Sequence, residues 1–360
     1  MKKRIGILTS GGDCPGLNCV IRAAVSHATR TYDWEVVGIP YATQGLLERK
    51  TVPLSVHGWD LRGIDPLLNM GGTILGTINK GNTLDHTDEI LASYEAIALD
   101  ALIAIGGDGS LNIIHQLAVI GNWNLVAIPK TIDHDVAFTE RSIGFDTAIN
   151  TIVDAINRLI FTAASHDRVM IIEVMGRTAG HLALHSGIAG GADVILIPEI
   201  PYTIKGICEH LTELRDRWQK KFAIIVVAEG ISACSENADD SNCTTAKCGQ
   251  GQYIAEQIAN CSHQLIDTRV SVLGHIQRGG IPSALDRLTA TMFGKVAVDL
   301  IAQNKYDQML AWQNGRVATF PIQDVIDKNP SLVDPSGDLV QTARSLGIYI
   351  GEEDKYCRVC

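Results

Sequence analysis

The sequence predicts an α/β fold built on mainly parallel sheets covered by helices. Short β-branched runs alternate with helical patterns along most of the chain, and each run stops at a polar, glycine-rich or charged cluster. Parallel strands need crossover connections, and strands buried on both faces are continuously apolar. With 360 residues, the chain is long enough for two or three domains of about 100 to 200 residues each.

The expected strands share a short run of apolar, largely β-branched residues. They are Arg4 to Leu8, Glu35 to Ile39, Ala101 to Ile105, Leu125 to Ile128, Arg168 to Val174, Val194 to Ile197, Phe222 to Ala228 and Arg269 to Leu273. Between strands, residues Phe145 to Ser165 carry apolar side chains at steps of three and four, which predicts a helix with one buried face. Another helix is expected to begin near Leu17.

Composition excludes several classes of protein. The chain is 46% apolar and 19% charged, which is too apolar for a disordered protein. No apolar run is long enough to span a membrane. The net charge of −10 offers no basic field to nucleic acid or to an anionic membrane surface. Nine scattered cysteines and a first apolar run too short for a signal peptide predict a reducing, cytoplasmic location.

Two glycine-rich clusters follow expected strands, where ligands of parallel sheets bind. Gly11 and Gly12 precede a helix, so backbone N–H groups could face a phosphate, although a plain turn is the alternative. In Gly106 to Ser110 the glycines allow backbone to approach a polyphosphate, and Asp108 can hold Mg²⁺ directly or through water. The alternative is a tight turn with a helix cap at Ser110.

A third cluster carries two carboxylates two residues apart, Asp133 and Asp135, shortly after the expected strand Leu125 to Ile128 and the Pro129 that follows it. Lys130 and Thr131 lie alongside. Phosphoryl transfer to an alcohol needs a carboxylate to accept the hydroxyl proton and cations on the transferring group. This one loop could supply most of that chemistry, whereas a solvated acidic turn would not need four polar groups after a buried strand.

Cationic side chains gather in the second half of this acidic chain. They are Arg168, Arg177, Arg269, His275 and Arg278. Arginine suits bidentate contact with phosphate, so the group suggests recognition of a phosphorylated metabolite beside a polyphosphate site.

These motifs together resemble 6-phosphofructokinases of the bacterial and plant type, from Arg4 to about Leu346. The resemblance rests on five segments in family order and spacing: residues 11–18, 105–110, 129–135, 175–177 and 273–280. It implies two Rossmann-like lobes with the active site between them. The donor-binding lobe would comprise residues 1–144 and about 277–325, and the fructose 6-phosphate lobe residues 145–276 and about 326–350. Residues 232–250 would form a surface insertion and 351–360 a tail.

The resemblance also implies the reaction: fructose 6-phosphate is phosphorylated at its 1-hydroxyl in glycolysis, with ATP and Mg²⁺. Asp133 matches the catalytic base, Asp108 the carboxylate that positions Mg²⁺, and Arg177 a cation near the transferring phosphoryl group. The residues that match donor-binding positions are Gly11, Gly12, Gly107, Gly109 and Ser110. Thr131, Asp135, Met175 and Gly176 match substrate-binding positions, and Glu229 matches the carboxylate that hydrogen-bonds the sugar. The positive groups around the 6-phosphate are matched by Arg168, Arg269, His275 and Arg278. In the family, two of the last group come from a neighbouring subunit, which implies a homotetramer.

Several positions depart from the family pattern. Asn79 stands where a nucleotide-contacting arginine is common, and Lys80 is the expected substitute. Arg22 of the bacterial allosteric site is kept, whereas Ser26 and Trp218 replace basic residues. Lys130 occurs in plant ATP enzymes and in pyrophosphate-dependent members, while Gly109 favours ATP because pyrophosphate enzymes carry an aspartate there. A pyrophosphate-dependent enzyme is therefore the alternative.

Three other hypotheses remain. A NAD or lipid kinase would share the Gly-Gly-Asp-Gly loop but leaves the cluster of His275 and Arg278 unexplained. A silent regulatory subunit would have no need for Asp108, Asp133 and Arg177. The cysteines suggest thiol-based redox control through Cys357 and Cys360 or through Cys234, Cys243 and Cys248, against the simpler interpretation of free thiols.

Overall fold

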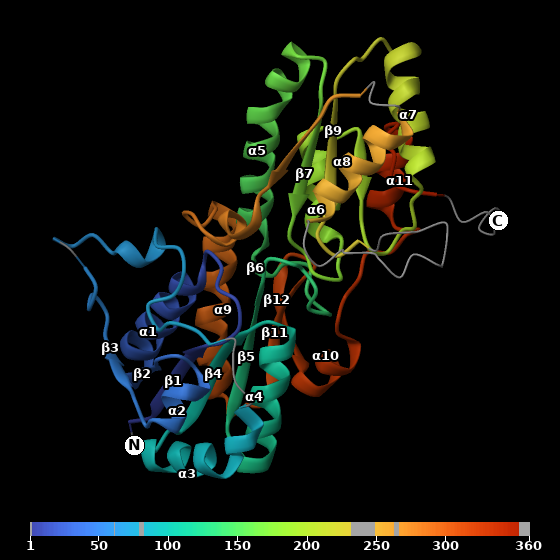
Figure 1. The fold of residues 1–360 in the computed structure, drawn as a ribbon. Helices are drawn as coiled ribbons and strands as arrows, with labels where there is room; N and C mark the ends of the chain where they lie inside the picture. Colours follow the sequence, from blue (N-terminus) through green and yellow to red (C-terminus); the bar gives the residue numbers. More distant parts are fainter. Residues whose placement is uncertain (1, 61, 79–82, 232–248, 263–265, 353–360) are drawn as a thin grey trace. The chain divides into compact units, whose positions relative to one another are not determined.

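A computed structural model describes residues 2–60, 62–78, 83–231, 249–262 and 266–352, and the chain divides into two compact units (Figure 1). Unit 1 is Met1–Thr147 with Arg278–Ser331, and unit 2 is Ala148–Gln277 with Leu332–Cys360. The last boundary follows residue 331 rather than residue 325, because helix α10 (Ile322–Lys328) packs on helix α4 (Asp108–Gly121) of unit 1. The expected insertion and tail lie largely outside the described residues.

Unit 1 is built on an 8-stranded sheet with the order β12-β11-β5-β4-β1-β2-β3, and β6 pairs with β5. Its strands are β1 (Arg4–Thr9), β2 (Glu35–Ile39), β3 (Val52–Leu54), β4 (Ala101–Gly106), β5 (Leu125–Thr131), β6 (Ile143–Gly144), β11 (Gln308–Gln313) and β12 (Arg316–Pro321). All pairs are parallel except those of the edge strands β3 and β12. The predicted parallel sheet is confirmed.

Helices cover both faces of this sheet. Besides α4 and α10, unit 1 contains α1 (Leu17–Tyr32), α2 (Thr43–Leu47), α3 (Thr87–Ile97) and α9 (Ala284–Ala302). The β1–β2 and β4–β5 connections run in opposite directions across the sheet, so right-handed crossovers place α1 and α4 on opposite faces. Accordingly α1 packs on α9, whereas α4 packs on α3 and α10. As predicted, α1 begins at Leu17.

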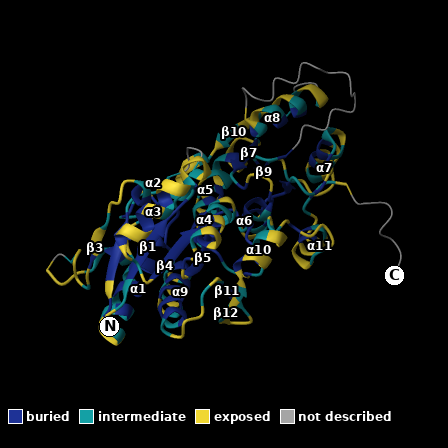
Figure 2. Cartoon of the chain, turned by 90° about the horizontal axis from the view of Figure 1, so that it is seen from below, coloured by how far each residue is buried: buried dark blue, intermediate teal, exposed yellow. Residues whose placement is uncertain are grey.

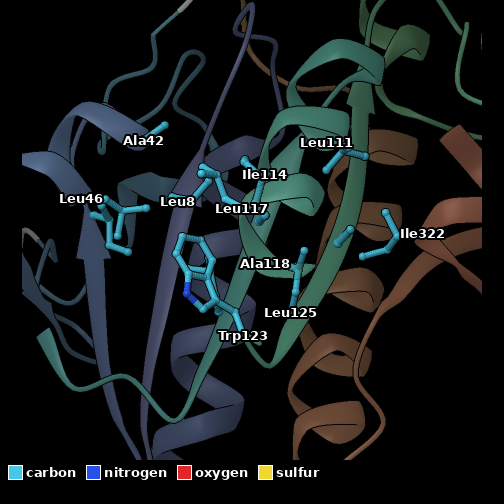
Figure 3. Packing of buried hydrophobic residues seen from close by; sticks show 14 of the residues in the cluster. Leu8, Ala42, Leu46, Leu111, Ile114, Leu117, Ala118, Trp123, Leu125 and Ile322 are labelled. Atoms are coloured by element: carbon cyan, nitrogen blue, oxygen red, sulfur yellow. The ribbon is translucent and has the colours of Figure 1, made fainter. Parts of the chain in front are cut away.

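One apolar cluster of unit 1 lies between the sheet and the α3–α4 layer. Leu8 of β1, Leu117 of α4 and Leu46 of α2 pack there around Trp123 (Figure 3). The Trp123 ring stacks on Tyr94 with centroids 4.0 Å apart. The central strands are buried along their length (Figure 2), which explains their continuously apolar sequences.

Unit 2 contains a 4-stranded, wholly parallel sheet with the order β10-β7-β9-β8. Its strands are β7 (Val169–Val174), β8 (Val194–Leu196), β9 (Ala223–Ala228) and β10 (Thr268–Val272). Its helices are α5 (Phe145–Ser165), α6 (His181–Gly190), α7 (Ile204–Asp216), α8 (Gln250–Cys261) and α11 (Asp338–Ser345). The range predicted for α5 is confirmed. No helix in the described ranges is both long and apolar enough to cross a membrane.

Asp286 is a buried carboxylate that ties the start of α9 to Gly144 and to the first turn of α5. It is 2% exposed and accepts hydrogen bonds from Gly144 N at 3.0 Å and Thr147 N at 2.9 Å, and from the Thr147 hydroxyl. Burial raises its pKa, because desolvation disfavours the charged form, while these donors lower it.

We expect Asp286→Ala to lower the free energy of unfolding by about 2 to 4 kcal/mol, because buried donors lose their acceptor. Chemical denaturation followed by circular dichroism measures this loss. Asp154→Ala is the control: Asp154 pairs with Arg158 on the exposed side of α5, and its loss should change stability by less than about 0.5 kcal/mol. Equal stability of the two variants would contradict the structural role of Asp286.

Candidate active site

The two glycine-rich loops follow neighbouring strands at the point where the sheet changes its winding direction. Gly11 and Gly12 follow β1, and Gly107 to Ser110 follow β4, with Thr9 paired to Ile105. The chain leaves β1 toward β2 on one side and β4 toward β5 on the other. Open α/β sheets bind ligands in the crevice at such a switch point, because the two connections separate there.

The two loops contact each other closely. Gly11 has a φ of 81°, and a Cβ at this residue would lie 2.5 Å from the Ser110 hydroxyl oxygen. Only glycine combines this backbone conformation with so near a neighbour. A Cβ at Gly12 would lie 2.6 Å from an Arg278 guanidinium nitrogen, and the same nitrogen donates to Asp13 O at 3.2 Å. Arg278, expected to contact the sugar phosphate, therefore lies over the first loop of unit 1.

The second loop is the first turn of a helix rather than a free turn. Helix α4 begins at Asp108, two residues before the cap considered at Ser110, and its N-cap Gly107 offers no side-chain acceptor. The backbone N–H groups of this turn thus face outward at the positive end of the helix dipole, which favours an anion. Around Gly109 nothing lies within 4 Å of the position that a Cβ would occupy.

The strand before the carboxylate loop runs further than the sequence indicated. The expected strand ended at Ile128, with Lys130 and Thr131 in the following loop, but β5 extends through Thr131 and buries both residues. The continuing main-chain pairing with β6 explains this difference. The Lys130 ammonium donates to Gly12 O of the first loop, and burial lowers its pKa because the charged form loses hydration.

Asp133 and Asp135 are both buried directly beyond β5, with 4% and 9% of their surfaces exposed. Asp133 N donates to the Thr131 hydroxyl at 3.0 Å, which folds the loop back on the end of the strand. One carboxylate oxygen of Asp135 is buried and accepts no hydrogen bond from any described residue. A buried oxygen in this state calls for a donor from outside the chain, such as a hydroxyl group or water.

In unit 2, a first group of predicted residues meets at the carboxyl end of the sheet. Met175, Gly176 and Arg177 follow β7, Glu229 follows β9 and His275 follows β10. Arg177 N donates to Glu229 Oε1 at 3.1 Å, so the arginine and the carboxylate are held together. The side chains of Arg177 and His275 lie at the surface of this end.

A second group lies at the opposite end of the same sheet. Arg168 precedes β7 and Arg269 is near the start of β10, so six residues of β7 separate Arg168 from Met175. At about 3.3 Å per residue this is roughly 20 Å. Asp267 joins the two arginines: it accepts from Arg168 at 2.6 Å and also from Arg269. The hydrogen bond from Arg168 is the main cause of the lowered pKa of Asp267. One carboxylate against two guanidinium groups leaves this end positive.

Three residues contribute to these arrangements although sequence reasoning gave them no role. Asp267 lies in no motif. Gln277 lies within the quoted segment 273–280; it is fully buried, accepts from Met175 N at 3.2 Å and donates to Gly274 O at 2.9 Å. Asn329 donates to Asp108 at 2.8 Å. Lys80 and the five cysteines of the redox hypothesis fall outside the described residues.

Asp108 is suited to bind a Mg²⁺ ion that is also coordinated by substrate phosphates. No group of three or more His, Cys, Asp or Glu in the described part of the chain could hold a metal by itself. Asp108 lies half-buried at the N-terminus of α4, with one oxygen held by Asn329. Mg²⁺ commonly binds one or two protein carboxylates together with substrate phosphates and water, so Asp108 at a helix N-terminus that favours anions would be sufficient.

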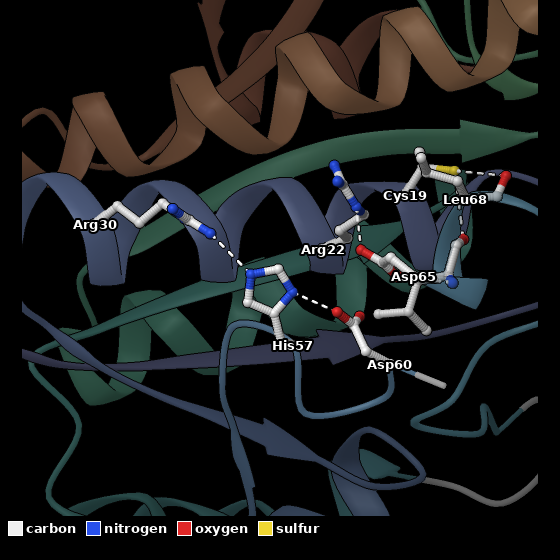
Figure 4. Close-up of polar contacts among 8 residues, drawn as sticks. Cys19, Arg22, Arg30, His57, Asp60, Asp65 and Leu68 are labelled. Carbon is white, nitrogen blue, oxygen red and sulfur yellow. Dashed lines mark hydrogen bonds and ion pairs between the residues drawn. The ribbon is translucent and has the colours of Figure 1, made fainter. Parts of the chain in front are cut away.

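A separate cavity in unit 1 lies between α1 and residues 54–60. The charged side chains that line it pair with one another (Figure 4). Arg22 pairs with Asp65, while Arg30 contacts His57 Nε2 at 3.0 Å and His57 Nδ1 pairs with Asp60. The cavity volume is about 50 Å³, enough for water but far below the roughly 300 Å³ of a small-molecule site.

Comparisons with known proteins identify the family of the chain. Residues 4–301 match the family model described as phosphofructokinase. The chain is 76% identical to ATP-dependent 6-phosphofructokinase 2 of Nostoc sp., over 98% of this chain and all of that protein. It is 63% identical to the ATP-dependent 6-phosphofructokinase of Thermosynechococcus vestitus, over 98% of this chain and 94% of that protein.

The fold of the chain is also similar to solved structures of phosphofructokinases. Phosphofructokinase from Saccharomyces cerevisiae matches with a TM-score of 0.75 and 27% identity over 91% of this chain, which spans 45% of the yeast chain's length. A pyrophosphate-dependent phosphofructokinase from Nitrosospira multiformis matches in fold, with a TM-score of 0.81 at 17% identity over 99% of this chain and 95% of that one. The fold and the paired glycine-rich loops thus define an α/β phosphotransferase. The chain belongs to the phosphofructokinase family.

Proposed function

We propose that this chain transfers the γ-phosphoryl group of ATP to the 1-hydroxyl of fructose 6-phosphate, in the presence of Mg²⁺, and so forms fructose 1,6-bisphosphate in glycolysis. One observation carries the proposal: two glycine-rich loops lie at the switch point of the unit 1 sheet, and two buried carboxylates follow a strand of the same sheet. The ATP-dependent relatives at 76% and 63% identity support the same reaction.

The donor phosphates would contact the two loops of unit 1. Backbone N–H groups around Gly11 and Gly12 and those of Gly107, Gly109 and Ser110 donate without bringing side-chain bulk. Asp108 would hold Mg²⁺, which supplies neutralisation of the phosphoryl charge. Arg278, over Gly12, adds a fixed cation to the same loops. Lys80 would contribute to donor binding as the substitute for a family arginine.

Asp133 would accept the proton of the attacking hydroxyl, because it is a buried carboxylate one loop away from the donor glycines. The Thr131 hydroxyl accepts a hydrogen bond from Asp133 N and so fixes the start of this loop. Asp135 offers its unbonded oxygen to a sugar hydroxyl. Arg177, held by Glu229, would stabilise charge on the transferring group.

The two groups of substrate-binding residues in unit 2 would contact different fructose 6-phosphate molecules. Met175, Gly176, Glu229 and His275 share the carboxyl end of the sheet with Arg177, whereas Arg168 and Arg269 lie roughly 20 Å away at the amino end. A hexose phosphate is too short to reach both ends of one sheet. We therefore propose that Arg168 and Arg269 serve the site of a neighbouring subunit in a cytoplasmic homotetramer.

Gly109 and Lys130 would decide the choice of donor. The open space at Gly109 leaves room for the α-phosphate of a nucleotide, which a carboxylate there would repel. The Lys130 ammonium, which a pyrophosphate enzyme could turn toward its donor, is engaged by Gly12 O. Both observations favour ATP.

We expect Gly109→Asp to lower kcat/KM for ATP by at least roughly tenfold, equivalent to about 1.4 kcal/mol. The variant should fold, because the site is open and an aspartate in the first turn of a helix is favourable. Gly109→Asn, of the same size without the charge, is the matched control and should lose less. If the two variants lose activity equally, bulk rather than charge decides, and the electrostatic argument for ATP fails.

A further inference from the structure

We propose that Asn329 is a positioning residue whose side-chain amide holds the Asp108 carboxylate and the segment after Asp133 in one fixed arrangement. The inference rests on the function proposed above and adds to it a residue outside the two loops. Asn329 lies about 200 residues further along the chain than either segment that it joins, so no sequence motif marks it.

The amide makes one hydrogen bond to each segment. Asn329 Nδ2 donates to Asp108 Oδ1 at 2.8 Å, and Asn329 Oδ1 accepts from Ala137 N at 2.7 Å. Two residues on, Ser331 N donates to Asp135 O at 2.7 Å. The segment 329–331 therefore connects the loop beyond β4 with the loop beyond β5 through three hydrogen bonds, all within unit 1.

The two partners fix the orientation of the Asn329 amide. The Asp108 carboxylate accepts a hydrogen bond, so the NH₂ group of Asn329 must face it. The Ala137 N–H can only donate, so the carbonyl oxygen of the Asn329 amide must face Ala137. Helix α10 fixes the position of the amide, because Asn329 is its C-cap, with its N–H on Val325 O at 3.0 Å, and α10 packs on α4.

This arrangement determines which way Asp108 points. Because Asn329 holds one carboxylate oxygen of Asp108, the other oxygen is left to receive a metal ion. The same amide joins Asp108 to the segment after Asp133 through Ala137 N. Groups that orient a metal-binding carboxylate typically change metal affinity or activity 10- to 100-fold when they are removed. A small misplacement of reacting groups lowers kcat by a similar factor.

The test is a double-mutant cycle in the full-length chain, read out by binding rather than turnover. The probe is Mn²⁺ saturated with a non-hydrolysable ATP analogue, and isothermal titration calorimetry measures the binding of this complex to the protein. We expect Asn329→Ala to weaken binding about tenfold, Asp108→Asn to weaken it further, and the double variant to bind no more weakly than Asp108→Asn alone.

Two readouts separate positioning from loss of structure. Asn329→Ala should also lower kcat about tenfold while the dissociation constant for fructose 6-phosphate, measured without donor, changes less than about threefold. Asn124→Ala is the matched control: its amide donates to Asp100 O at 2.8 Å at the opposite end of the same sheet, and its removal should leave both values unchanged. If Asn329→Ala does not fold, Asn329→Ser takes its place, since serine is too short to reach Asp108.

Additive losses in the cycle, or Mn²⁺ binding and kcat within twofold of wild type, would overturn the role of Asn329. A wild-type chain that binds the metal–nucleotide probe without phosphorylating fructose 6-phosphate would instead contradict the proposed function. The cycle would still decide the role of Asn329 in that case, because it does not depend on turnover.

Discussion

Asp133→Ala is expected to lower kcat by roughly 10²- to 10⁴-fold, with a smaller effect on KM for either substrate. Asp133 is the buried carboxylate that follows Thr131 at the end of β5, and removal of a general base affects mainly the transition state. Initial rates at saturating substrates measure the loss in kcat, and calorimetric titration with fructose 6-phosphate measures the remaining affinity.

Asp100→Ala provides the matched control for this prediction. Asp100 is also a carboxylate next to a strand of the unit 1 sheet, but it accepts from Arg4 N at the amino end, away from the loops. It should retain nearly all of kcat. A near wild-type kcat in Asp133→Ala would remove Asp133 from the role of base.

Arg168→Ala or Arg269→Ala is expected to raise KM for fructose 6-phosphate roughly 10- to 100-fold, with little effect on kcat. Each arginine would make a charge-assisted contact with the non-reacting 6-phosphate, worth roughly 1.5 to 3 kcal/mol in both ground and transition state. In either variant Asp267 still has the other arginine as a hydrogen-bond partner, so no carboxylate is left unpaired. Arg158→Ala, which breaks an exposed ion pair on α5, is the control and should leave KM unchanged.

Hybrid oligomers test whether these arginines act in a neighbouring subunit. Chains carrying Arg269→Ala are mixed with chains carrying Asp133→Ala, and the mixture is refolded together. If sites are shared, some sites in the hybrids combine an intact Asp133 with an intact Arg269, and activity at low fructose 6-phosphate exceeds the average of the two parents. Hybrid activity that never exceeds this average would contradict shared sites.

Local patterns predicted much of the fold because the strands are buried on both faces. The eight expected strands all occur, with ends shifted by one residue in most cases and by three at β5, where pairing with β6 extends the strand. The hairpin of β11 and β12 was missed although a signal was present: Asn314 and Gly315 both have positive φ, as a tight two-residue turn requires.

The candidate site was predictable wherever its residues follow strands in recognisable motifs, as Asp108 and Asp133 do. Asn329 and Asp267 were not, because each acts through a contact with segments that only the tertiary fold brings near. Sequence order also grouped Arg168 with Arg177, nine residues apart, whereas β7 carries them to opposite ends of a sheet. Proximity along the chain therefore indicated the kind of ligand without indicating which site each arginine serves.

The most direct test compares phosphoryl donors for the purified wild-type chain. Initial rates are measured with fructose 6-phosphate and saturating Mg²⁺, and with ATP, ADP or pyrophosphate as the donor. We expect fructose 1,6-bisphosphate to form fastest with ATP, because Gly109 leaves the space beside the donor loop open and uncharged. Faster turnover with pyrophosphate than with ATP, or no turnover with any of the three donors, would contradict an ATP-dependent 6-phosphofructokinase.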